Sequence, residues 1–69
     1  MTISQKQFDF LTRLMRCTGK AQEGARLVLV KGEHNADAAR AVGATPQAVH
    51  RLSKRIAEEH ETAQRLFRG

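Results

Sequence analysis

The side chains best suited to chemistry lie around the single proline of the chain. They are polar or basic and recur at short, helix-like intervals: Thr45, Gln47, His50, Arg51, Lys54 and Arg55. Residues at such intervals share one side of a helix. An arginine on that side can donate two hydrogen bonds to guanine, and a glutamine can pair with adenine. We therefore predict that the first four side chains read base edges in the major groove of DNA and that the last two contact phosphates.

A helix that begins at Pro46 would present these side chains. Thr45 provides an N-cap hydroxyl, and proline suits the first helical position because its missing N–H has no intrahelical partner there. The apolar residues that follow keep a helical spacing: Val49, Leu52, Ile56, Ala63 and Leu66. Glu59 interrupts that spacing. Two alternatives therefore stay open, one helix to about Phe67, or a helix to about Glu58 followed by a separate C-terminal piece.

Three shorter helices are predicted upstream. Ser4 and Gln7 have the spacing of a capping box, which indicates a helix over about residues 5–17. A second helix is expected over about residues 20–31. The run LVLV at 27–30 is also compatible with a strand, but that strand would have no partner. Asn35 is expected to cap a third helix over about residues 36–42, which Gly43 ends. The predicted fold is one small all-α domain of four helices, or five if the last one breaks.

The turn between the third helix and the helix that begins at Pro46 has only three residues, 43–45. The two helices must therefore cross at a steep angle. Such a crossing requires small side chains at the contact, and the turn requires a positive φ. We assign these structural roles to Ala39 and Gly43, and we expect Val49 to fill the wedge between the helices. The motif, at about residues 35–56, is a helix-turn-helix, whose second helix enters the major groove.

Two stretches of the chain resemble known proteins. NADAARAVGATPQAVHRLSKR resembles the bacterial helix-turn-helix pattern, with a small residue four positions before the turn glycine. The overlapping stretch ARLVLVKGEHNADAARAVGATPQAV resembles the TrfB, or KorA-type, plasmid repressors, and the likeness extends back to SQKQF. It covers about residues 4–56. This resemblance implies a bacterial transcriptional repressor of plasmid or phage type that forms a dimer and binds a palindromic operator.

The segment after the motif differs from the rest in charge. Residues 56–69 carry two basic and three acidic groups, whereas residues 35–55 carry four and one, and residues 1–34 carry six and three. An acidic, amphipathic tail suits contact with protein better than contact with DNA. We expect homodimer contacts from Ile56, Ala63, Leu66 and Phe67, with the N-terminal helix as the alternative interface. The expected target is then an inverted repeat in double-stranded DNA.

The whole chain is basic, with twelve Lys and Arg against seven Asp and Glu. This excess favours an anionic partner, either nucleic acid or an acidic membrane surface. Lys31 and Arg40 are further candidates for phosphate contacts. No apolar run approaches the roughly 20 residues of a membrane span, and the first residues do not read as a secretory signal. We therefore expect a cytoplasmic protein that does not enter membranes.

Metal and catalytic chemistry are not expected. Cys17 is the only cysteine, so it has no partner for a disulfide or a metal pair, and a buried apolar position suits it. The three histidines lack the spacing of metal ligands: His34, His50 and His60. The acidic residues of the tail crowd one polar stretch in a chain too small to enclose a pocket: Glu58, Glu59 and Glu61. We predict no metal, no cofactor and no enzyme activity.

Two other functions compete with a repressor at this stage. One is a module similar to the promoter-recognition helix-turn-helix of sigma factors, which would contact RNA polymerase. The other is non-specific nucleic-acid binding through charge alone, which would depend strongly on salt and carry no preference for sequence.

Overall fold

The computed structural model describes residues 3–16 and 18–68, with side chains described as far as residue 66. Within these ranges the chain forms four helices and no strand: α1 Gln5–Met15, α2 Lys20–Leu29, α3 Asn35–Val42 and α4 Pro46–Arg68. The all-α prediction is confirmed. The last segment is one continuous helix of 23 residues, so the alternative with a fifth helix is not realised. No helix in the described part is both long and apolar enough to cross a membrane.

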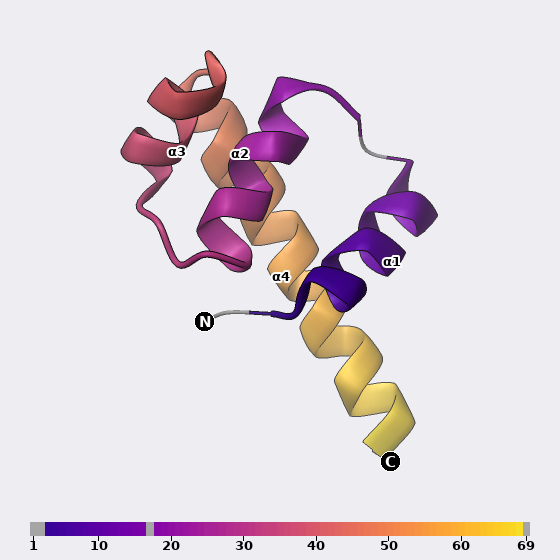
Figure 1. Ribbon diagram of the computed structural model, residues 1–69. Coiled ribbons are helices and arrows are strands. Elements are labelled where there is room, and N and C mark those ends of the chain that lie inside the picture. The colour runs from indigo at the N-terminus through magenta and orange to yellow at the C-terminus, as the bar shows by residue number, and fades with distance from the viewer. Residues whose placement is uncertain (1–2, 17, 69) are drawn as a thin grey trace.

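Helix α2 lies at the centre of the fold. It packs against α3 and α4, and α1 packs against both α2 and α4. Figure 1 shows α4 running behind α2, with α3 and α1 on opposite sides and the C-terminal part of α4 extending beyond the other helices. The backbone N–H of Ile3 donates to the carbonyl of Leu29 at 2.8 Å, which ties the N-terminal segment to the end of α2.

Two groups of buried side chains hold the helices together. The first joins the N-terminal segment, α1, α2 and α4: Ile3, Phe8, Leu11, Ala25, Leu29 and Ile56. The second lies between α3 and α4, against α2: Ala38, Ala39 and Val49. Most of these side chains are small or aliphatic, so helices can approach closely. Complete burial of an aromatic side chain such as Phe8 contributes about 1.5–3 kcal/mol relative to exposure.

The position of Ile56 corrects one sequence-based prediction. Its side chain is 0% exposed and packs in the core shared by α1, α2 and α4 of the same chain. A side chain that is already covered has no surface left for a second copy. Ile56 is therefore a core residue of the chain itself, and of the four tail residues expected to contact a second copy only the later three are left as candidates.

Local signals explain most helix boundaries. Ser4 and Gln7 form the expected capping box, with both reciprocal hydrogen bonds at 3.1 Å. Helix α1 ends at Met15, and Arg16 turns the chain with a φ of 55°. This is earlier than expected, and Cys17 lies outside the described residues. Helix α2 ends at Leu29, two residues before the expected end, and Gly32 follows with a φ of 78°.

The start of α3 also differs from the prediction. Asn35 was expected to cap the helix, but it is the first helical residue, and His34 occupies the cap position without a side-chain hydrogen bond. The reason is tertiary, because the Asn35 amide is engaged with a residue of α4 instead. Helix α4 begins as predicted, with the Thr45 hydroxyl accepting a hydrogen bond from the Ala48 N–H at 3.2 Å.

Candidate nucleic-acid interface

The turn between α3 and α4 is built on a left-handed glycine. Gly43 has φ 74° and ψ 31°, a conformation that residues with a Cβ adopt only at a cost. The N–H groups of Gly43 and Ala44 both donate to the carbonyl of Ala39, so the turn closes on the last turn of α3. Ala39 is 1% exposed and Val49 is 0% exposed, which lets the backbones of α3 and α4 approach closely.

Sequence reasoning missed a second close approach, at Gly24 in α2. A Cβ atom at this position would lie 2.5 Å from Cγ2 of Val49 and 3.4 Å from Cγ2 of Val42. Only a glycine allows α2 to pack this tightly on both helices of the motif. A glycine inside a helix is usually unfavourable by about 0.5–1 kcal/mol relative to alanine, so its presence there was the available signal of a packing constraint.

The opposite side of α4 is open to solvent. The buried residues of this helix follow one stripe: Val49, Ser53, Ile56 and His60. The residues proposed to contact DNA from this helix are all exposed and lie off that stripe: Gln47, His50, Arg51, Lys54 and Arg55. Their spacing spreads them over the outer side of the first three turns: Gln47 and Arg51 point most directly away from the buried stripe, and His50 lies at the edge nearest to it. Thr45, also exposed, sits at the N-terminal end of the same helix.

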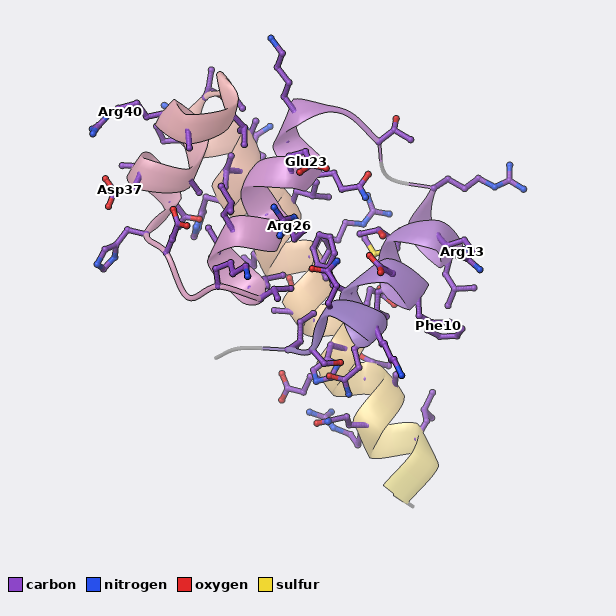
Figure 2. All side chains as sticks on the ribbon, viewed as in Figure 1. Phe10, Arg13, Glu23, Arg26, Asp37 and Arg40 are labelled. Atoms are coloured by element: carbon purple, nitrogen blue, oxygen red, sulfur yellow. The ribbon has the colours of Figure 1, made fainter. Side chains whose placement is uncertain are left out.

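The other two phosphate candidates are less closely tied to this face. Arg40 extends from the end of α3, next to Asp37, with 3.8 Å between the guanidinium and the carboxylate (Figure 2). The side chains of this pair are 81% and 58% exposed, so the pair contributes little to stability and leaves Arg40 free to exchange partners. Lys31 is exposed in the segment between α2 and α3, outside both helices of the motif.

Lys20 extends the basic surface to the turn itself. Its Nζ atom lies 3.8 Å from the place that a Cβ on Gly43 would occupy. The first turn of α2 therefore brings a positive charge beside the turn that leads into α4. Nothing in the spacing of the sequence indicates this contact, because 23 residues separate the two positions.

One polar contact joins the two helices of the motif. The Asn35 side-chain nitrogen lies 3.2 Å from Nδ1 of His50, fifteen residues along the chain. The Asn35 oxygen on the same amide is buried and has no hydrogen-bond partner. A histidine that the sequence marks as a possible base contact is thus held from α3, which sequence reasoning did not foresee.

The charge of α4 changes sign along its outer side. Arg51, Lys54 and Arg55 are followed by three exposed acidic residues: Glu58, Glu59 and Glu61. Arg65 pairs with Glu61 at 3.3 Å and is itself largely exposed. The excess of basic over acidic side chains on this helix therefore lies in its N-terminal half, and the helix macrodipole favours an anion at the N-terminus itself.

The tail of α4 is apolar at few of its described positions. Ala63 is half-buried and Leu66 is 74% exposed, while the side chain of Phe67 lies outside the described residues. Helix α1 presents two further exposed apolar side chains one turn apart, Phe10 at 59% and Leu14 at 65% (Figure 2 labels the first). In the described part of the chain, no group of three or more potential metal ligands is present.

Comparison with known proteins adds one finding. The model of a family described as TrfB plasmid transcriptional repressor matches residues 1–67 of the chain. No match was found among curated proteins or among solved structures.

Proposed function

Because the chain belongs to the TrfB plasmid transcriptional repressor family, we propose that it represses transcription by placing α4 in the major groove of a specific operator. The observation that carries this proposal is the exposed outer face of α4, which unites a glutamine, a histidine and an arginine next to the helix N-terminus. In a helix-turn-helix, that end of the second helix reaches the base edges.

The proposed contacts with DNA are of two kinds, contacts with bases and contacts with phosphates. Thr45, Gln47, His50 and Arg51 read bases, with Arg51 forking onto a guanine as the strongest single contact. Four basic side chains hold phosphates and set the register of the protein on the duplex: Lys31, Arg40, Lys54 and Arg55. This division predicts that the two groups respond differently to mutation.

Comparison of Arg51→Ala with Lys54→Ala tests this division. We expect Arg51→Ala to weaken binding to the cognate site by about 1–3 kcal/mol and to relax the preference at one base position. Lys54→Ala is the matched control, because it removes a positive charge from the same exposed face, about one helical turn from Arg51. It should weaken all duplexes alike and lower the salt dependence of binding.

The cognate site comes from selecting bound DNA out of a random pool, and binding is then measured at several salt concentrations. If Arg51→Ala weakened cognate and random duplexes equally, the base-reading role would be wrong. If the wild-type protein selected no sequence, the function would reduce to non-specific binding. Copurification with RNA polymerase, together with failure to bind isolated duplexes, would instead favour a polymerase-associated module.

We further propose that the protein acts as a homodimer on an inverted repeat. One recognition helix contacts only a few base pairs, whereas two helices related by a dyad reach successive major grooves about 34 Å apart. The apolar side chains of the tail are the proposed contacts: Ala63, Leu66 and Phe67. The exposed pair Phe10 and Leu14 on α1 is the competing surface.

Sedimentation of the free protein and of its DNA complex tests the dimer, and a monomer in both would disprove it. Removal of residues 61–69 then tests the interface, because it keeps His60, which is 8% exposed and belongs to the buried stripe of α4. We expect the truncated protein to be monomeric. Leu14→Lys is the matched surface change on α1. If it abolished the dimer while the truncation did not, the interface would lie on α1.

A further inference from the structure

The hydrogen bond between α3 and α4 constrains one of the side chains proposed to read bases. Asn35 lies at the first position of α3, and its amide nitrogen is 3.2 Å from Nδ1 of His50. A neutral histidine ring carries one proton, so the nitrogen that accepts a hydrogen bond cannot also donate. When Nδ1 accepts from the amide, the ring proton must be on Nε2.

The buried oxygen of Asn35 supports this orientation of the amide. That oxygen has no hydrogen-bond partner, so this orientation leaves one buried acceptor unsatisfied. Reversing the amide would place its NH2 group at the same buried position and leave two N–H donors without a partner. The reversed amide would therefore be less favourable, and the orientation with the nitrogen next to His50 is retained.

Given the proposed function, we infer that Asn35 is a positioning residue, which holds the His50 ring so that its Nε2–H is presented to DNA as a donor. A ring fixed in this form pairs with the acceptors of the major groove, such as N7 and O6 of guanine, N7 of adenine or O4 of thymine. It does not pair with the amino group of cytosine. An unheld ring can exchange its proton between the two nitrogens and discriminates less.

The first experiment follows the ring itself, without DNA. In the free protein at about pH 8, where a histidine ring in water is neutral, 15N NMR distinguishes the two protonated forms. We expect wild-type His50 to show a proton on Nε2 and through-space contacts with the Asn35 amide protons. Asn35→Asp replaces the donor with an acceptor, so the proton should move to Nδ1. A wild-type ring protonated on Nδ1, or no contact with Asn35, would overturn the inference.

The second experiment measures base preference by selection from a random DNA pool. We expect His50→Ala and Asn35→Ala to relax the preference at the same base position, with Asn35→Ala reducing discrimination by roughly five-fold, the size of one neutral hydrogen bond. The double variant should discriminate no less than His50→Ala, because both changes remove the same contact. The matched control is Ala36→Asn, which adds an amide to the same turn of α3 at an exposed position and should leave the preference unchanged.

The outcomes separate this inference from the proposed function. If the wild-type protein selects no sequence, the proposed function fails, whatever the ring shows in NMR. If the wild-type protein selects a site but the effects of Asn35→Ala and His50→Ala add, or fall on different base positions, the positioning role of Asn35 is wrong and the repressor assignment stands. Melting temperatures of all variants show which losses come from unfolding, and the tautomer remains readable in any variant that folds.

Discussion

Replacement of Gly24 by alanine sets two opposing effects against each other. Helix propensity alone predicts a gain of about 1 kcal/mol, because alanine has less backbone freedom to lose than glycine. The added methyl, however, would lie 2.5 Å from Cγ2 and 3.3 Å from Cγ1 of Val49. Carbon atoms in good contact are about 3.5–4.0 Å apart, so roughly 1 Å of separation is missing.

The surroundings leave little room for relief. Val49 is β-branched, 0% exposed and packed between α2 and α3, so its rotamer cannot change freely. Overpacking of a core costs about 1–3 kcal/mol, and this site belongs at the upper end of that range. After the gain in propensity, we expect Gly24→Ala to destabilise the protein by about 1–2 kcal/mol. For a domain of this size, each kcal/mol lowers the melting temperature by about 4–8 °C.

Thermal and urea unfolding of four proteins measure the effect: the wild type, Gly24→Ala, Val49→Ala and the double variant. Val49→Ala alone should cost about 2 kcal/mol in lost burial. In the double variant the new methyl fills the space that the valine vacates, so the double variant should be about 1–3 kcal/mol more stable than the two single changes predict together. A Gly24→Ala protein that melts at or above the wild-type temperature would refute the close approach, and so would strictly additive changes.

The remaining predictions concern the turn, the helix crossing and the first cap. Gly43→Val should destabilise the domain by about 2 kcal/mol, since its φ of 74° is strained for a β-branched residue, whereas Gly43→Asn should be tolerated better; equal melting temperatures would contradict this. Ala39→Leu, at a 1% exposed position, should lower both stability and operator affinity by wedging α3 from α4; a wild-type melt would remove the tight crossing. Ser4→Ala should cost about 1 kcal/mol of stability and leave DNA binding of the folded protein unchanged.

The parts of the fold that the sequence could predict are those that short-range physics determines. The capping box at Ser4 and Gln7 and the Thr45–Pro46 start of α4 each depend on residues within one turn of the boundary. Gly43 is of the same kind, because a glycine at a helix end usually marks a left-handed residue. The exposed face of α4 followed from these boundaries together with helical spacing.

The parts that could not be predicted depend on contacts between distant residues. Asn35 has the properties of a cap, but a partner fifteen residues away engages its amide. Ile56 fits a seam between two copies, yet α1 and α2 of its own chain already cover it. The sequence indicates no packing role for His60, yet its side chain lies in the buried stripe of α4, 8% exposed. In each case the residue type indicates a role, but the sequence does not show which distant residue it contacts.

The unbroken course of α4 fixes an angular phase between its two ends. Each residue of a helix advances the chain by about 1.5 Å and rotates it by about 100°, so one alanine inserted after Glu61 would swing Leu66 by that angle relative to Arg51 while leaving both surfaces chemically intact. An insertion of about seven residues, close to two full turns, would restore the original bearing at a greater distance. If the tail forms the proposed dimer contact, the length of α4 determines the direction in which the second copy presents its own α4 to the DNA. In the proposed dimer, a change in the spacing of the operator half-sites would therefore be matched best by insertions or deletions close to whole turns of α4.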